Sequence, residues 1–250
     1  MSAAGADGAP ALDYADRYDP DTHVDRWYTD ATGAAIARHV RPGEHVLELG
    51  CATGRMSARL VEAGATLVGV DRSPAYLERA RDRHLPGATF CAGDVESWVS
   101  RPPADDPGAD RRRADHVVAT NLVHELTDPA GFVRGAARWL RPGGRLHLSL
   151  QNPRSIHRLV GLATGAITDL KAVTEAGREL HTRELFDADD LCAMGIAAGL
   201  VDDGREGVML KPVPNGVMAT LPDEVLEGFV RVAVHVPEHC SMNYVRLRKP

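Results

Sequence analysis

Short apolar runs alternate with amphipathic segments along most of this 250-residue chain. Apolar runs closed by glycine or aspartate are typical of buried parallel strands, and the segments between them repeat with the period of a helix. The predicted strands are residues 45–50, 65–71, 88–95, 115–120, 145–150, 205–211 and 241–247. The predicted helices are residues 55–64, 73–84, 128–140, 187–199 and 222–234, with two more within 152–186. This order predicts an α/β fold with a doubly wound, seven-stranded, mostly parallel sheet and one reversed strand near the C-terminus.

The composition favours one globular unit. Apolar residues make up 44% of the chain and charged residues 26%, which is sufficient for a sizeable core. A net charge of −6 and only 5% aromatic residues argue against a nucleic-acid partner, which needs a basic face or stacking side chains. The four cysteines lack metal-ligand spacing, and no apolar run is long enough to span a membrane. We therefore expect a reduced, cytoplasmic protein with no metal and no membrane or nucleic-acid partner.

Two further segments have a simple interpretation. Residues 1–12 are small and polar and are predicted to be disordered, whereas 13–40 read as helical with a break at Pro20. Residues 101–113 are rich in proline, aspartate and arginine and are predicted to form an exposed loop. An anion site at Arg111–Arg113 is the alternative for this loop. No linker separates two domains, so we expect a single domain over residues 1–250.

The stretch that constrains function is the turn between the first strand and the next helix. Its sequence is Glu48-Leu-Gly50-Cys-Ala-Thr-Gly54, so the pattern differs from the G-x-G-x-x-G of dinucleotide binding. A glycine loop that opens a helix points backbone N–H groups at a ligand. Glu48 adds a carboxylate that suits a ligand with a positive end.

Two aspartates follow at the ends of the next strands. Asp71 ends the second strand, where a carboxylate accepts hydrogen bonds from ribose hydroxyls. Asp94 follows Gly93 after the third strand, where it would accept from the amino group of an adenine. These positions predict a nucleoside ligand across the carboxyl ends of the strands.

Five motifs in this order resemble the class I S-adenosylmethionine-dependent methyltransferases. They are VLELGCATG (46–54), VGVDRS (69–74), AGDVE (92–96), HVVATNLVHEL (116–126) and LRPGGRLHLSLQNP (140–153). Ala52 stands where the family carries the middle glycine of the loop, from which we expect a slightly tighter loop and no loss of binding. A Rossmann-like domain that binds another nucleotide is the alternative. The resemblance implies a doubly wound Rossmann-like fold and S-adenosylmethionine as cofactor, with S-adenosylhomocysteine as product.

The resemblance also assigns roles along the chain. It implies an N-terminal lid at 1–40, a cofactor-binding core at 41–150 and insertions at 151–186 and 212–240 that cover the substrate. The cofactor-binding residues that it implies are Tyr28, Glu48, Gly50, Cys51, Ala52, Thr53, Gly54, Asp71, Arg72, Gly93, Asp94, Val95 and Asn121. Tyr28 and Trp27 have a second interpretation as core residues of a helix face.

Catalytic and acceptor-binding candidates lie after the fourth and fifth strands. His124 and His157 are the catalytic candidates, and His124 is preferred as the general base. A histidine bonded to a backbone carbonyl is the alternative for His124. The substrate-binding candidates are Glu125, Asn152, Arg158 and His239. Arg158 could bind an anionic substrate group, or it could be an outward arginine of a capped helix.

Three functions remain open at this point. The first is transfer of a methyl group to oxygen, nitrogen or carbon of a small molecule, in bacterial secondary or sugar metabolism. The second is a protein or RNA acceptor, although no Asn/Asp-Pro-Pro-Tyr motif follows the fourth strand. The third is a cofactor-binding module without transfer activity. The sequence gives neither the acceptor nor the oligomeric state.

Overall fold

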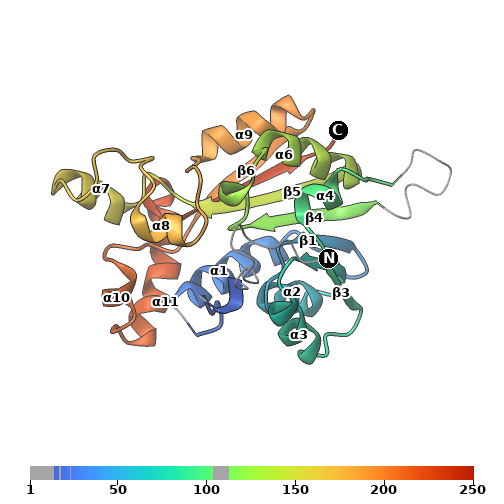
Figure 1. Cartoon of the computed structure of the whole chain (residues 1–250), viewed down its shortest axis with the longest axis horizontal. Coiled ribbons are helices and arrows are strands. Elements are labelled where there is room, and N and C mark those ends of the chain that lie inside the picture. The colour runs from blue at the N-terminus through green and yellow to red at the C-terminus, as the bar shows by residue number, and fades with distance from the viewer. Residues whose placement is uncertain (1–13, 17, 23, 104–112) are drawn as a thin grey trace, which may run out of the picture.

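A seven-stranded sheet with the order β3-β2-β1-β4-β5-β7-β6 forms the centre of the molecule (Figure 1). The computed structural model describes residues 14–16, 18–22, 24–103 and 113–250. The strands are β1 His45–Leu49, β2 Thr66–Asp71, β3 Ala88–Ala92, β4 Ala114–Thr120, β5 Leu140–Gln151, β6 Val201–Val208 and β7 Met242–Arg248. β7 runs antiparallel to both β5 and β6, and the other pairs are parallel. The predicted doubly wound sheet with one reversed strand is confirmed.

Helices cover both faces of this sheet (Figure 1). One face carries α1 Asp25–Ala37, α2 Arg55–Glu62 and α3 Pro74–Asp82, and the other carries α4 Val95–Val99, α6 Pro129–Trp139 and α9 Ala188–Ala197. Two buried clusters result. Ile36, Leu60 and Leu77 belong to the first, and Phe132 and Leu191 belong to the second. Burial of apolar side chains on both faces explains why the central strands read as continuous apolar runs.

Local capping explains where the helices of the core begin. Ser73 accepts a hydrogen bond from Tyr76 N at 3.1 Å, and Pro74 occupies the first turn of α3. Asp128 caps α6 in the same way, with Pro129 next. The Ser73–Pro74 cap was visible in the sequence, because an oxygen-bearing side chain followed by proline is typical of a helix start.

Several bounds differ from the sequence prediction. β3 ends at Ala92, because Asp94 accepts from Ser97 N at 2.8 Å and starts the unpredicted helix α4. β5 begins at Leu140 rather than at 145. β6 is an exposed edge strand with few apolar residues, so the apolar cue placed it too late in the sequence, at 205–211. The true strand ends at Val208, and Met209 then turns the chain with φ +53°.

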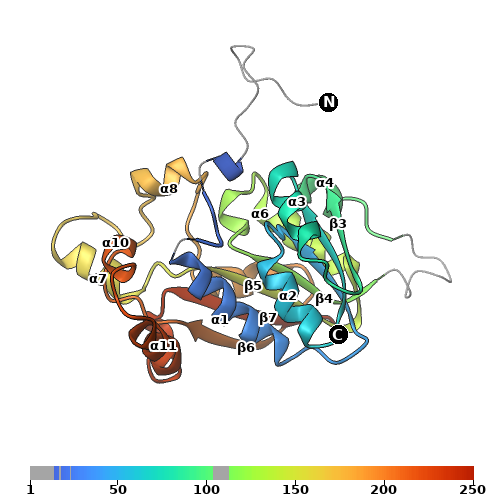
Figure 2. The same cartoon turned by 90° about the horizontal axis from the view of Figure 1, so that it is seen from below.

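The remaining helices gather at one end of the sheet (Figure 2). They are α7 Ile156–Ala163, α8 Glu175–Glu179, α10 Asn215–Met218 and α11 Asp223–Arg231. Short 3-10 helices are η1 Tyr14–Asp16, η2 Val123–Glu125, η3 Val232–His235 and η4 Pro237–His239. Residues 1–12 and most of the loop predicted at 101–113, including Arg111, lie outside the described residues. Within the described part of the chain, no helix has the length and hydrophobicity that crossing a membrane requires.

Candidate active site

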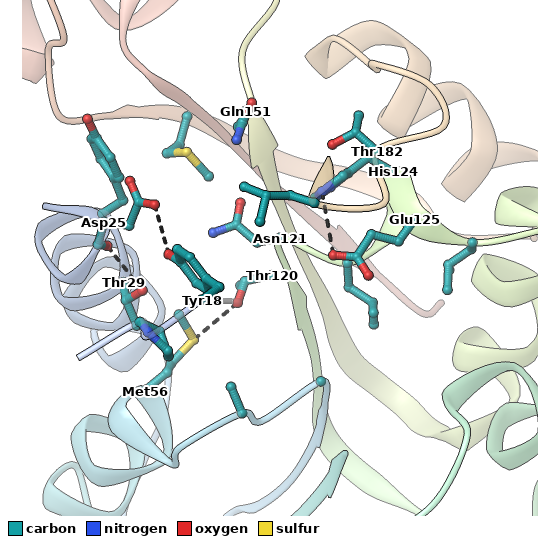
Figure 3. A pocket seen from close by; sticks show the side chains of 18 of the residues that line it. Tyr18, Asp25, Thr29, Met56, Thr120, Asn121, His124, Glu125, Gln151 and Thr182 are labelled. Carbon is teal, nitrogen blue, oxygen red and sulfur yellow. Dashed lines mark hydrogen bonds and ion pairs between the residues drawn. The ribbon is translucent and has the colours of Figure 1, made fainter. Parts of the chain in front are cut away.

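A cavity of about 600 Å³ lies where the strands β1, β2, β4 and β5 end (Figure 3). Parallel strands bring their carboxyl ends to one edge of the sheet, which is where doubly wound folds bind ligands. Side chains reach the cavity from four directions: the N-terminal segment, the loop after β1, the end of β4 and the segments after β5 and β6. Of the thirteen predicted cofactor-binding residues, all but Gly54 line it.

The loop after β1 is held in a left-handed backbone conformation. Gly50, Ala52 and Gly54 have φ values of +79°, +44° and +72°. Gly50 N donates to Val70 O at 2.8 Å, and Ala52 N donates to the Asp71 carboxylate at 2.9 Å. A Cβ on Gly54 would lie 3.1 Å from Ala80 Cβ, so Gly54 allows α2 to pack on α3 rather than facing the cavity. Ala52 therefore keeps the loop geometry, but it does so in a conformation that disfavours a side chain.

Asp71 is fixed in place by backbone donors. Its second carboxylate oxygen accepts from Ser73 N at 2.9 Å. Burial raises the pKa of Asp71, while the backbone hydrogen bonds from Ser73 and Ala52 act in the opposite direction. Asp94 is more exposed and caps α4. The two carboxylates thus stand at the ends of β2 and β3, as the sequence predicted.

Glu48 differs from the expectation of an ionised carboxylate. The side chain is fully buried beside Ser57, whose hydroxyl donates to it. Burial raises the pKa of Glu48 to about 8, so the carboxyl group is mostly protonated at pH 7. A positive ligand would be met by an ionised Glu48 only if that ligand itself lowered the pKa.

The N-terminal segment closes one side of the cavity. Tyr18 OH donates to the Asp25 carboxylate at 2.8 Å, and both residues line the cavity (Figure 3). Asp21 accepts from Arg83 at 2.9 Å and from Thr53 Oγ1 at 3.2 Å, which ties the segment to α3 and to the glycine loop. Tyr28 is buried and also faces the cavity, while Trp27 packs in the core of that face.

His124 and Glu125 form a pair at the end of β4. His124 Nε2 lies 3.8 Å from Glu125 Oε1 (Figure 3), and His124 Nδ1 is buried with no hydrogen-bond partner among the described residues. Burial lowers the pKa of His124 to about 4 and raises the pKa of Glu125 to about 7, against the charge of Arg72. At pH 7 His124 is therefore neutral and Glu125 is about half ionised. Within this pair, Glu125 is the group whose pKa suits a general base near neutral pH.

The end of β4 turns sharply into this pair. Asn121 has φ +50°, and its backbone N–H donates to Ser149 O at 2.8 Å on β5. Figure 3 shows Asn121 between Tyr18 and Gln151, at the centre of the open space. Arg183 holds η2 from the other side, since Arg183 N donates to His124 O at 2.8 Å and Arg183 Nε donates to Glu125 O at 3.1 Å.

The candidate residues after β5 differ in whether their polar groups are already bonded to the backbone. His157 lines the cavity with Nδ1 3.1 Å from Ser155 Oγ, and burial lowers its pKa to about 4. Asn152 and Arg158 line it too, but their polar groups are bonded to the backbone. Asn152 Nδ2 donates to two carbonyl oxygens at 2.9 and 3.0 Å, and Arg158 donates to Leu170 O and Ala172 O at 2.9 and 2.7 Å.

His239 does not belong to this site. It lines a second, smaller cavity instead, with Nδ1 3.2 Å from Arg154 O. The 3-10 helix η4 directs it there. The placement of His239 with the acceptor candidates is therefore corrected.

Several cavity residues were missed from the sequence. They include Asp25, Thr29, Met56, Glu96, Thr120, Gln151, Thr182, Lys211 and Asn215. Thr120 and Gln151 end β4 and β5, so their place at the carboxyl edge of the sheet was a usable signal. The sequence prediction placed Lys211 inside the strand at 205–211. In the structure β6 ends at Val208, so Lys211 lies beyond the end of the strand. In the part of the chain that the structure describes, no group of three or more His, Cys, Asp or Glu side chains could hold a metal ion.

The cavity fits the cofactor that the motifs imply. The glycine loop leaves room for a ligand against the backbone, and Asp71 is held at the end of β2 with its carboxylate fixed by two N–H groups. Acidic side chains also line the cavity, which is favourable for a sulfonium cation. The comparisons with known proteins point to the same cofactor.

Residues 47–146 match the family model described as a methyltransferase domain. A ubiquinone biosynthesis O-methyltransferase from Aeromonas salmonicida is 29% identical over 192 residues, which cover 76% of this chain and 74% of that protein. The enzyme of the same name from Xanthomonas campestris is 32% identical over 116 residues, 46% of each chain, so the chain spans about half the length of that relative. The crystal structure of magnesium protoporphyrin IX methyltransferase from Synechocystis with bound S-adenosylhomocysteine superposes with a TM-score of 0.57 at 16% identity, over 90% of this chain and 84% of that one. At that identity the superposition concerns the fold alone.

The domain match covers the strands and loops that form the cofactor side of the cavity, and the sheet order continues the same fold to the end of the chain. Residues 47–146 thus match a methyltransferase domain, and together with the five motifs, the fold and the relatives this indicates a class I S-adenosylmethionine-dependent methyltransferase.

Proposed function

We propose that this methyltransferase acts on a small molecule, at oxygen, nitrogen or carbon, in bacterial secondary or sugar metabolism. The observation that carries the proposal is the cover over the cavity. Asp21 ties the N-terminal segment to α3, and Arg183 ties the segment after α8 to η2, so protein closes the cavity from two sides. Such a cover suits an acceptor that fits inside a cavity of about 600 Å³.

The single domain of residues 1–250 divides into the parts that the sequence suggested. We assign the N-terminal segment up to residue 40 to closure over the cofactor, the core at 41–150 to its binding, and the segments at 151–186 and 212–240 to the acceptor. Within the core, Asp71 would hold the ribose and Asp94 the adenine edge. Asn121 and Tyr28 would stand at the methionine end, with Arg72 and Val95 beside the nucleoside.

The chemistry needs positioning and the loss of one proton. Bound S-adenosylmethionine supplies an activated methyl group on a sulfonium. The residues of the cavity hold the acceptor atom in line with that methyl group and exclude water. At the end of β4, Glu125 is the ionisable base that takes the acceptor's proton, and His124, whose Nε2 lies 3.8 Å from Glu125 Oε1, stands beside it as a positioning residue. His157 also lines the cavity and would serve as a second polar contact.

The name of the relatives supports oxygen among the three acceptor atoms, since both are called O-methyltransferases. A carbon acceptor would need a stronger base, because a C–H proton is less acidic than the O–H proton of a phenol. The presence of an ionisable carboxyl with a pKa of about 7 is in keeping with a hydroxyl acceptor.

Turnover assays with purified protein test the proposal. The protein is incubated with S-adenosylmethionine and panels of phenols, amines and sugars, and in parallel with RNA and with a protein extract, while S-adenosylhomocysteine is measured. Turnover confined to small molecules is the expected result. Turnover with RNA or protein alone would assign the macromolecular acceptor. Calorimetric binding of the cofactor and its product without turnover in any panel would indicate a module without transfer activity.

A further inference from the structure

Lys211 is a half-buried basic side chain of the cavity that no oxygen of the described residues engages. The four arginines of the cavity, Arg55, Arg72, Arg158 and Arg183, are each hydrogen-bonded or ion-paired with a carboxylate or a backbone carbonyl. Lys211 has no hydrogen bond or ion pair with any residue that the structure describes. A half-buried ammonium group that faces a cavity and makes no direct hydrogen bond or ion pair is a place where an anion binds favourably.

The surroundings of Lys211 are basic and aromatic. Its Nζ lies 6.0 Å from the centre of the Tyr28 ring. Burial lowers the pKa of Lys211, Asp25 acts in the opposite direction, and Arg158 lowers it further. The charges of Lys211 and Arg158 in turn contribute to the low pKa of His157. Three basic groups therefore share this wall of the cavity.

Asp25 makes no direct ion pair with Lys211, although its negative charge favours the protonated lysine. One of its oxygens accepts from Tyr18 OH at 2.8 Å and the other accepts from Asn215 Nδ2 at 2.9 Å. Arg158 is also committed, since its guanidinium binds the carbonyls of Leu170 and Ala172. Arg158 thus acts as a positioning residue that supports this wall. The Lys211 ammonium remains available to bind a ligand.

The fold places Lys211 on the acceptor side. It lies between β6, which is the edge strand opposite β3, and α10. α7, which carries His157 and Arg158, lies at the same end of the sheet as α10 (Figure 2). The glycine loop and Asp71 belong to β1 and β2, toward the other edge of the sheet.

We propose that Lys211 binds a carboxylate of the acceptor, which makes the substrate class small carboxylic acids that receive the methyl group at another atom. The inference rests on the proposed small-molecule function. A charge-assisted hydrogen bond from the Lys211 ammonium fixes the far end of the acceptor, so the reacting atom is held near His124 and Glu125. Asn215 and Tyr28 line the same part of the cavity and shape the space around the carboxylate.

The test uses binding to the protein loaded with S-adenosylhomocysteine, so it does not depend on turnover. Acetate, hexanoate and benzoate are titrated by calorimetry or NMR, each beside its carboxamide. The expected result is preference for at least one acid over its amide, with its affinity reduced about tenfold to a hundredfold by Lys211→Met. Lys211→Arg, which keeps the charge, should retain part of the affinity. No preference for any acid, or equal affinity in Lys211→Met, would overturn the inference.

Two controls separate this result from other causes. Lys171→Met removes an exposed lysine that pairs with Asp187 and Asp190 outside this cavity, and it should leave acid binding unchanged. The cofactor also carries a carboxylate, so affinity for S-adenosylhomocysteine is measured in Lys211→Met. A loss there, without a change in acid binding, would assign Lys211 to the cofactor and overturn the inference. Acid binding together with failure of every turnover panel would instead reject the proposed function while the carboxylate site stands.

Discussion

The two sides of the cavity are built in different ways. The cofactor side, formed by β1, β2 and β3 with their loops, is held by contacts between neighbours in the fold's repeating units, such as Ala52 N to the Asp71 carboxylate. The acceptor side is held by contacts between distant parts of the chain, such as Asn215 to Asp25, which are 190 residues apart. The first is determined by a repeated strand–turn–helix pattern, whereas the second depends on how the insertions pack.

This difference suggests a division of labour. A side built from the fold's own units suits a cofactor that does not change, while a side built from insertions can vary with the acceptor. Glu125 lies where the two meet, because it is ion-paired with Arg72 beside the cofactor loops and its carbonyl is held by Arg183 from the acceptor cover. Substitutions at this junction and on either side of it should therefore have separable effects.

The largest effect is expected at the junction. If Glu125 takes the acceptor's proton, Glu125→Gln should lower kcat by about 10²-fold or more, the range for loss of a general base. The pKa of Glu125 is about 7, so the ionised form, and with it kcat/KM, should increase as pH rises through about 7. This acidic limb of the pH–rate profile should disappear in Glu125→Gln.

His124→Gln is the matched comparison. The pKa of His124 is about 4, so His124 is already neutral at neutral pH and a limb due to it would lie near pH 4. The variant should be slower but should keep the limb near pH 7. If the limb instead disappears in His124→Gln and persists in Glu125→Gln, the histidine is the base, as the sequence suggests. If both variants keep it, the limb reports ionisation of the acceptor.

The next effect tests the cofactor side alone. Asp71→Ala removes a carboxylate at the end of β2 that also accepts from Ala52 N and Ser73 N. Affinity for S-adenosylhomocysteine should fall by about 1–3 kcal/mol, as is usual for lost hydrogen bonds to a charged group. Calorimetry measures this directly, and Asp82→Ala, an exposed aspartate at the end of α3, serves as the charge control. Unchanged affinity in Asp71→Ala would remove Asp71 from the binding site.

The sequence predicts the cofactor side of the cavity better than the acceptor side. The glycine loop, Asp71 and the cap at Ser73 were predicted from the sequence, because each follows from a short local pattern at the end of a strand or the start of a helix. Lys211 was not readable, because β6 is an exposed edge strand and its end was placed three residues too late.

Residues after β5 show the same limit. Arg158 and Asn152 were identified as polar residues near the site, and both do line the cavity. Their partners are backbone carbonyls brought in by segments whose packing no local pattern specifies. A residue type near a strand end thus predicts proximity to the site, but the free or bonded state of its polar group depends on tertiary contacts.

The smallest effect concerns the one departure from the family's loop. Ala52 has φ +44°, a conformation that costs an L-residue about 1–2 kcal/mol. Glycine relieves that cost but increases the entropy of the unfolded chain by an amount worth about 0.5–1 kcal/mol. Ala52→Gly should therefore raise the free energy of unfolding by at most about 1 kcal/mol, or Tm by about 2–4 °C, with cofactor affinity unchanged. Ala58→Gly, inside α2, should instead lower Tm by a similar amount, because helix interiors disfavour glycine. An equal decrease in both variants would contradict a left-handed residue 52 and with it the tight loop on which the cofactor side is built.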